Sequence, residues 1–449
     1  MIITFLGKGF KTEKEKRAYY RYDDFLSTKF ELKKDGRYTN MLPLLIDNFD
    51  EKIIPIYTKE AEDTQKIFLE DEFGKSYEEI FDEDYFIEDT KDFSSIMKIL
   101  NKVLQQDNEY ILDLTHSFRH LPILATISLI SNHNINKDNI KHIFFAKEEI
   151  PASKDVIGKY QIIDLKNYIE LADVSYMLST FNQNYTISGN IKFSNPLYQQ
   201  LANELKKFSE HFLSNSLKAI IEDDLIDNIF SVFNELEKKE DIVNLKSYIK
   251  EIKRHLSNIQ KIKEEKYEYK KLYKLSQIMD KRGYQLNAIT LLFEATGYYC
   301  LEAIYKNTTK AKAHIDRFKK FIDEGKEPEN IYSNYTLVYQ SRTIIKKLNR
   351  FNNSYLFNPE TIDIPKKELP KKLPKKESNI IKYEIIDFAN SLSKNDFHSF
   401  KKFLGKLESF RNNLSHGNSS EQIEDVEIIF ERFIENFEKF CIKKNILKL

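Results

Sequence analysis

The sequence predicts an α/β domain at the N-terminus, followed by a chain that is almost entirely α-helical. Short apolar runs bounded by turn residues alternate with helical patterns over the first 165 residues, which is typical of a sheet covered by helices. From there to residue 449 the apolar spacing is helical nearly throughout. The whole chain contains only 11 glycines and 10 prolines, which favours long regular elements.

Strands and helices alternate in the first part. The strands end in loops that carry polar and charged residues, and the last strand ends near residue 165. The expected strands are 2–6, 52–58, 109–114, 141–145 and 158–164, and the expected helices are 38–49, 59–72, 92–106 and 121–132.

Helical periodicity then continues to the C-terminus. The expected helices are 165–182, 196–213, 215–238, 241–279, 284–306, 308–323, 330–350, 379–392, 395–415 and 420–445. Residues 237–274 are dense in Lys and Glu, so we expect a long exposed or interprotomer helix with charges paired one turn apart. Residues 365–377 form a basic repeat punctuated by proline, which predicts an exposed, semi-rigid linker.

The composition is that of a soluble globular protein with 41% hydrophobic and 31% charged residues. Lys and Arg balance Asp and Glu at 70 each, so contact with nucleic acid must come from a local basic patch. Cys300 and Cys441 have no metal-ligand spacing, which indicates reduced thiols, no metal site and a cytoplasmic location. The sequence carries no export signal, and the apolar run at 121–130 is too short to span a bilayer, so we expect no membrane role.

A glycine-flanked lysine follows the first expected strand. Gly7 and Gly9 allow the backbone to approach an anion closely, and Lys8 adds positive charge. A plain turn at the end of a strand would give the same three residues. The segment is therefore a candidate anion-binding loop with a structural alternative.

A second polar loop follows the expected strand 109–114. Backbone donors at a helix N-terminus, a hydroxyl from Thr115 or Ser117 and the guanidinium of Arg119 together suit a phosphate group. His116 orients a ligand or takes part in chemistry, or else it bonds the backbone in a structural role. Both loops are expected at the carboxyl edge of the sheet.

Near the C-terminus, Arg411, Asn412 and His416 combine residue types that suit RNA cleavage. In that reaction the ribose 2′-hydroxyl attacks its own phosphate, so a protein need supply proton transfer, orientation and stabilisation of charge. Histidine transfers protons near neutral pH and arginine binds phosphate, and no metal is required. A structural alternative is a helix C-terminus with His416 near its carbonyls and Gly417 as the stop.

These motifs, in this order, resemble those of known CRISPR-associated proteins. Residues 5–9 (Phe-Leu-Gly-Lys-Gly) and 113–122 (Asp-Leu-Thr-His-Ser-Phe-Arg-His-Leu-Pro) resemble the CARF sensor domains of these proteins. Ser117 stands where one CARF subgroup usually has glycine, which alters the expected detail of the pocket. Residues 411–416 (Arg-Asn-Asn-Leu-Ser-His) are similar to the signature of HEPN ribonucleases.

The CARF–HEPN resemblance implies a Rossmann-like sensor at 1–165, a helical connector at 166–283 and a helical HEPN ribonuclease domain at 284–449. It implies a type III CRISPR accessory endoribonuclease that cleaves single-stranded RNA, leaves 2′,3′-cyclic phosphate ends and is activated by cyclic tetra- or hexa-adenylate. It also implies a twofold homodimer, because a ring of repeated adenylates matches a symmetric pair of sensor loops. By resemblance the catalytic residues are Arg411, Asn412 and His416, and the ligand-binding residues are Gly7, Lys8, Gly9, Thr115, His116, Ser117 and Arg119.

Two alternatives remain open at this point. The first is a cyclic-nucleotide sensor that acts through a protein or DNA partner without nuclease activity. In the second, which is compatible with the ribonuclease, the N-terminal domain is itself a ring nuclease that degrades the cyclic ligand. The absence of a recognisable recognition helix or basic face disfavours the first. Slow loss of the ligand in the presence of the isolated domain would reveal the second.

Overall fold

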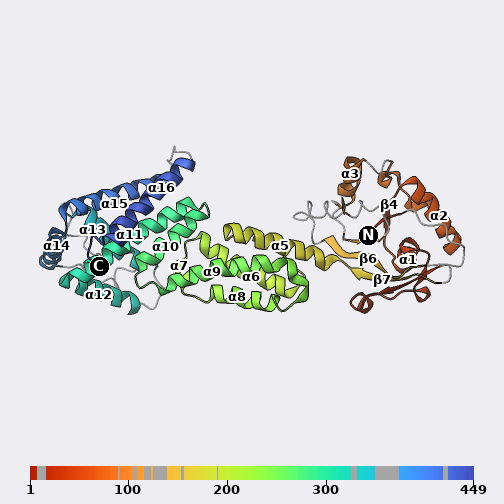
Figure 1. Ribbon diagram of the computed structural model, residues 1–449, viewed down its shortest axis with the longest axis horizontal. Coiled ribbons are helices and arrows are strands. Elements are labelled where there is room, and N and C mark those ends of the chain that lie inside the picture. The colour runs from red at the N-terminus through yellow and green to blue at the C-terminus, as the bar shows by residue number, and fades with distance from the viewer. Residues whose placement is uncertain are drawn as a thin grey trace. The chain divides into compact units, whose positions relative to one another are not determined.

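The computed structural model describes residues 1–7, 17–88, 92–104, 109–115, 123–124, 139–152, 156–189, 191–324, 331–348, 374–417 and 423–449. The chain forms two compact units, Met1–Val174 and Ser175–Leu449, and the boundary between them falls within helix α5 (Lys166–Asn184). The first unit holds a mixed sheet and the second is predominantly helical, as expected from the two kinds of periodicity (Figure 1).

The first unit is built on a seven-stranded sheet of order β3-β2-β7-β6-β5-β1-β4. β1 is parallel to β4 and β5, and β5 is parallel to β6, but β6–β7 and β2–β3 are antiparallel. The sheet is therefore mixed, with its antiparallel pairs on the side of β7, β2 and β3. The strands are β1 (Ile2–Phe5), β2 (Ala18–Tyr22), β3 (Arg37–Tyr38), β4 (Ile53–Ile56), β5 (Tyr110–Asp113), β6 (Ile140–Ile150) and β7 (Lys159–Asp164).

Both faces of the central strands are buried, so β1 and β5 read as continuous apolar runs. Alternate side chains of β1 enter different cores: Ile2 lies in one and Ile3 in the other. The helices of this unit are α1 (Met41–Asn48), α2 (Lys59–Phe73) and α3 (Phe93–Leu104). Helix α1 begins after Asn40, whose side chain accepts a hydrogen bond from the N–H of Leu42, and so starts later than predicted.

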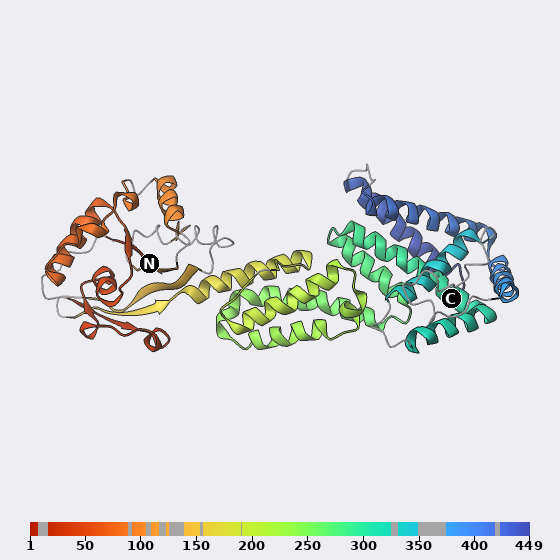
Figure 2. The same cartoon turned by 180° about the vertical axis from the view of Figure 1, so that it is seen from behind.

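Twelve α-helices fall in the described ranges here, namely α5 at the boundary and eleven in the second unit. The yellow-green helices α6 to α9 pack together, and α11 packs against α10, α12, α13, α15 and α16 (Figure 2). Those after α5 are α6 (Pro196–Leu213), α7 (Leu217–Ile221), α8 (Leu225–Leu236), α9 (Lys246–Gln260), α10 (Glu268–Lys281), α11 (Gln285–Asn307), α12 (Thr309–Glu324), α13 (Ile331–Lys347), α14 (Lys375–Asn390), α15 (Lys394–Ser415) and α16 (Ile423–Phe437), the last followed by a π-helical turn at Glu438–Lys443.

The prediction of one long exposed helix across residues 237–274 is wrong. The segment contains the separate helices α9 and α10, joined through a short 3-10 turn at Lys261–Glu264. Ile249, Ile252, Leu256 and Ile259 form a buried face of α9, so this helix packs into the unit. The charges also pair between helices, as when Lys253 of α9 contacts Glu237 at 2.7 Å. The dense charge therefore covers the outside of a packed bundle.

Within the described ranges, no helix has both the length and the apolar character needed to cross a membrane. Residues 365–373 of the basic segment predicted as a linker lie outside these ranges. The linker prediction is wrong for its last three residues, Lys375 to Glu377, which form the first turn of α14.

Candidate functional site

The two predicted ligand loops begin at the same edge of the sheet. β1 and β5 are parallel neighbours with Thr4 paired to Asp113, so the chain leaves both strands on one side. Gly7 follows β1 and Thr115 follows β5, and both are partly buried. Ligands of α/β sheets bind at this carboxyl edge. The other predicted ligand residues, Lys8, Gly9, His116, Ser117 and Arg119, lie outside the described residues.

A buried carboxylate joins the two strands beneath this edge. Asp113 has no exposed surface, and its side chain accepts hydrogen bonds from the hydroxyls of Thr4 at 2.7 Å and Thr115 at 2.6 Å. The backbone N–H of Thr115 donates a third bond, at 3.1 Å. A buried carboxylate is tolerated only when such donors replace water. Asp113 therefore determines where the loop after β5 begins.

The hydroxyl of Thr115 is already engaged on both sides. It donates to Asp113, and its oxygen accepts a hydrogen bond from the N–H of Ala146 in β6 at 2.9 Å. A hydroxyl has a single proton to donate, so in this arrangement it cannot also donate to a phosphate oxygen. Thr115 therefore ties the start of the loop after β5 to both β5 and β6. Its contact with a ligand stays a prediction.

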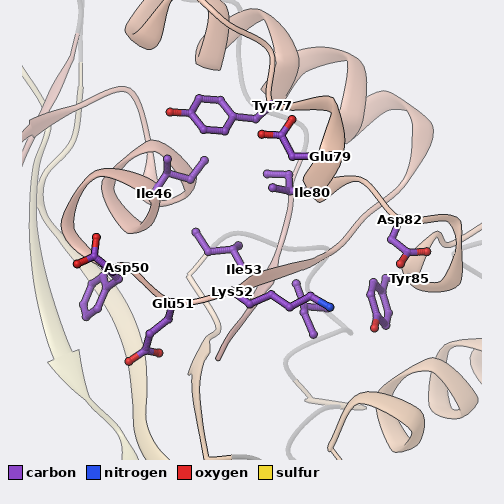
Figure 3. Close-up of a pocket in the computed structure, with 12 residues that line it drawn as sticks. Ile46, Asp50, Glu51, Lys52, Ile53, Tyr77, Glu79, Ile80, Asp82 and Tyr85 are labelled. Carbon is purple, nitrogen blue, oxygen red and sulfur yellow. The ribbon is translucent and has the colours of Figure 1, made fainter.

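A pocket of about 450 Å³ lies at the opposite edge of the same sheet. It is lined by Lys52 and Ile53 at the start of β4, by the end of α1 and by residues 77–85 (Figure 3). Carboxylates of Asp50, Glu51, Glu79 and Asp82 outnumber its one lysine. An acidic pocket repels phosphate, and this one is at the amino end of the strand. It is therefore unsuited to the predicted ligand.

The C-terminal motif lies at the end of α15. Residues spaced three and four apart give this helix one buried face, which packs against the rest of the unit over about half of the helix's length. The buried residues are Phe400, Phe403, Leu404, Leu407 and Phe410. Lys346 of α13 also forms an ion pair with Glu408, which ties α15 to a neighbouring helix one turn before Arg411.

His416 and Gly417 end the helix as the structural alternative predicted. The N–H of His416 bonds the carbonyl of Asn412 at 3.0 Å, and Gly417 adopts φ +64°. Such a left-handed residue after a helix is favoured for glycine. The His416 side chain is exposed, so the same residue that closes the helix also presents its imidazole to solvent.

Arg411 is held from two sides. Its Nη1 donates to the side-chain oxygen of Asn412 at 3.0 Å, and its guanidinium carbon lies 5.0 Å from the ring centroid of Phe293 in α11. Its Nε is buried without a hydrogen-bond partner. The structure therefore brings Arg411 and Asn412 together, whereas no hydrogen bond joins the side chains of Arg411 and His416, both of which are described.

Phe293 contacts this arginine, Arg342 stacks on the same Phe293 ring and Glu294 is the next residue along the chain, and none of the three was predicted. Phe293 and Glu294 come from α11 and Arg342 from α13. They lie far from Arg411 in the sequence, so no local spacing could connect them to it. A weak signal was present, because Glu294 and Arg342 are single charges within otherwise apolar or neutral stretches of their helices.

The chain resembles a known protein over half of its length. Across 231 residues it is 23% identical to the CRISPR-associated protein MJ1674 of Methanocaldococcus jannaschii. This likeness supports a CRISPR-related role. The matched region covers 50% of this chain and 34% of that protein, so the chain spans about a third of the relative's length. No family model matches the chain.

In the part of the chain that the structure describes, no group of three or more His, Cys, Asp or Glu side chains is arranged to hold a metal ion. Burial raises the pKa of the Cys300 thiol to about 12, although Arg342 opposes this effect. Cys441 is also buried. Both cysteines are therefore protonated core residues near neutral pH.

Proposed function

We propose that the chain is a single-stranded RNA endoribonuclease of type III CRISPR defence, activated by a cyclic oligoadenylate. The observation that carries this proposal is the end of α15, where a held guanidinium, its amide partner Asn412 and an exposed imidazole lie within six residues. The distant CRISPR-associated relative supports a CRISPR-related role, in which we place this ribonuclease.

In the proposed reaction the ribose 2′-oxygen attacks the adjacent phosphorus and the bond to the 5′-oxygen breaks. The products carry a 2′,3′-cyclic phosphate and a 5′-hydroxyl. His416 transfers a proton or positions the 2′-hydroxyl, Arg411 stabilises charge on the phosphoryl oxygens and Asn412 orients Arg411. Every proton moves between side chains, water and RNA, so the reaction needs no metal ion.

A homodimer completes the proposed cleavage site. Arg411 is directed toward Phe293 in the protein, whereas His416 faces solvent, so the two side chains of one protomer do not converge. Two copies of the end of α15 placed together would pair the arginine of one protomer with the histidine of its partner. The same twofold symmetry suits a ring of repeated adenylates.

The sensor half of the proposal rests on the carboxyl edge of the sheet. Gly7 and Thr115 start loops there, and Lys8 and Arg119 are the cations that the sequence places in those loops. Arg119→Ala should weaken binding of the cyclic ligand, because a guanidinium binds phosphate through two parallel hydrogen bonds. An unchanged ligand affinity would remove Arg119 from the pocket.

The proposal is tested with a fluorogenic RNA in excess EDTA, with cyclic tetra-adenylate, cyclic hexa-adenylate or neither. Cleavage that appears with only one ring supports the ribonuclease and identifies its activator. A protein that binds a ring but cleaves nothing is instead a sensor that acts through a partner. Loss of the added cyclic oligoadenylate, measured by chromatography, would reveal ring nuclease activity, which this alternative assigns to the first unit.

A further inference from the structure

The aromatic ring of Phe293 in α11 contacts the guanidinium groups of two arginines from two other helices. The guanidinium carbon of Arg342 in α13 lies 3.2 Å from the ring centroid, and that of Arg411 in α15 lies 5.0 Å from it. Arginine is attracted to the face of an aromatic ring because that face is electron-rich, and the attraction acts within about 6 Å. Phe293 is 3% exposed, so little water competes for this ring.

Arg342 fixes the position of the ring. Its Nη1 donates a hydrogen bond to the carbonyl of Phe293 at 2.9 Å while its guanidinium lies over the ring, so one group holds both the backbone and the side chain of Phe293. Gly297 makes room for α13 at this point, because a Cβ there would lie 2.4 Å from Val338 Cγ1 and 3.3 Å from Arg342 Nη1. Phe293 is therefore held in place independently of Arg411.

Helix α13 also fixes the helix that carries Arg411. Lys346 lies one turn after Arg342 on α13 and forms an ion pair with Glu408 of α15, which is one turn before Arg411. Two residues one turn apart on α13 thus hold α11 through Phe293 and α15 through Glu408. The distance between the Phe293 ring and the backbone of Arg411 is therefore set by α13.

The guanidinium of Arg411 has one donor that only the ring is placed to compensate. Among the described residues its Nε is buried without a hydrogen-bond partner, whereas its Nη1 donates to Asn412 at 3.0 Å. A buried N–H group without an oxygen acceptor is costly, and the face of an aromatic ring is a weak acceptor for such a group. The contact with Phe293 therefore favours one orientation of the guanidinium.

We propose that Phe293, held by Arg342, is a positioning residue whose aromatic ring orients the guanidinium of Arg411 in the cleavage site. This inference rests on the proposed ribonuclease function. The side chain of arginine is long, and its donors stabilise the phosphoryl oxygens only when they point toward them. A contact that selects this orientation before RNA binds should therefore raise kcat. Phe293 acts through Arg411 and touches no substrate.

Fluorination of the ring tests this role, because it weakens the attraction for a cation while it nearly keeps the shape of the side chain. Phe293 is replaced in the full-length protein by mono-, di- and trifluorinated phenylalanine. With saturating RNA and the activating cyclic oligoadenylate, kcat should fall stepwise, to about one-fifth with the trifluorinated residue. A constant kcat across the series overturns the proposal.

Phe403 of α15 provides the matched control. It is buried, and its ring contacts other aromatic rings, those of Phe400, Phe433 and Phe440. The same fluorinated series at Phe403 should leave kcat unchanged. An equal fall at both positions would show that fluorination acts through packing of the core, and this also overturns the proposal.

A thermal-unfolding cycle of the full-length protein separates this proposal from the ribonuclease, because the contact between Phe293 and Arg411 exists whether or not RNA is cut. The trifluorinated residue should lower the Tm of the wild type more than that of Arg411→Met, in which one of the two cations at the ring is absent. Equal Tm shifts in the two backgrounds contradict the positioning role, even if RNA cleavage is confirmed. A smaller shift in Arg411→Met supports the contact even if no RNA is cut, and only the proposed ribonuclease function then fails.

Discussion

The guanidinium of Arg411 and the side-chain amide of Asn412, adjacent residues of one helix, are joined by a 3.0 Å hydrogen bond. Adjacent side chains on a helix point about 100° apart, so this bond requires the arginine to fold back toward its neighbour. The amide oxygen thereby fixes one of the guanidinium donors. The remaining N–H donors of the Arg411 guanidinium are therefore held in a more restricted orientation.

Asn412→Ala should therefore reduce ring-activated RNA cleavage about tenfold, because one charge-assisted hydrogen bond that orients Arg411 is lost. Initial cleavage rates at saturating ring measure this. Asn413→Ala is the matched control, since Asn413 is the exposed neighbour. Equal rates for the two variants would show that the Arg411–Asn412 bond has no role in catalysis.

His416→Ala should lower cleavage by at least about 100-fold, the usual contribution of a positioned proton-transfer group. Affinity for the ring, measured by calorimetry, should not change, because the loops proposed to bind the ring belong to the first unit. His398→Ala on the same helix provides the control, as His398 is exposed. If H416A cleaves as fast as H398A, the assignment of His416 is wrong.

Asp113→Ala should destabilise the first unit by about 3 kcal/mol, since three hydrogen bonds to a fully buried carboxylate disappear and their donors are left unpaired. Ring affinity should fall as well, because the loop after β5 loses its anchor. Chemical denaturation and calorimetry measure the two effects. Thr28→Ala, which removes an exposed hydroxyl bond to the Phe25 carbonyl, should leave both near the wild type. Wild-type stability for D113A would contradict the anchoring role.

The carboxyl of Asp164 should make the free energy of unfolding of the first unit depend on pH. Burial raises the pKa of its carboxyl, but hydrogen bonds from His142 at 2.6 Å and from the N–H groups of Ile143 and Lys166 outweigh burial, and the pKa is lowered. The stabilisation is thus complete above the unfolded-state pKa of about 3.9, and is lost as pH falls through the lower folded-state pKa. Urea unfolding between pH 6 and 2, at roughly half-unit steps, should show a steeper acid loss for wild type than for Asp164→Asn. If the free energy of unfolding falls equally with pH in the wild type and in Asp164→Asn, the stabilising role of the Asp164 carboxylate is contradicted.

The positions of helices and strands could be predicted where their apolar residues follow a regular pattern along the sequence. Four of the five expected strands, and helices such as α6 and α11, lie within two residues of their expected bounds. The fifth, β6, continues to Ile150, five residues beyond its predicted end, where its last four residues are exposed. β2 and β3 were missed because they lie toward the far side of the sheet, where exposed Tyr19 and Arg37 interrupt the apolar pattern. The break between α9 and α10 was missed because both helices share the same dense charge, which hides the turn at Lys261–Glu264.

The candidate cleavage site was predicted only in part, for a similar reason. Arg411, Asn412 and His416 share one helix and one short motif, so spacing alone connects them. Phe293 and Arg342 come from separate helices, and only the packing of α11 against α13 and α15 brings them to Arg411. In the first unit the sequence predicted Thr115 as a ligand residue. Its hydrogen bonds to Asp113 and Ala146 give it an anchoring role, and its contact with a ligand stays a prediction.

The most direct test is mass spectrometry of the ends left on a single-stranded RNA by the ring-activated protein in excess EDTA. The RNA should be cut only when cyclic tetra- or hexa-adenylate is present, and the products should carry 2′,3′-cyclic phosphate and 5′-hydroxyl ends. A substrate with a 2′-deoxyribose at the cleaved position should resist cleavage there. Intact RNA with both rings, or products with 5′-phosphate and 3′-hydroxyl ends, would contradict cleavage by the 2′-hydroxyl at Arg411 and His416.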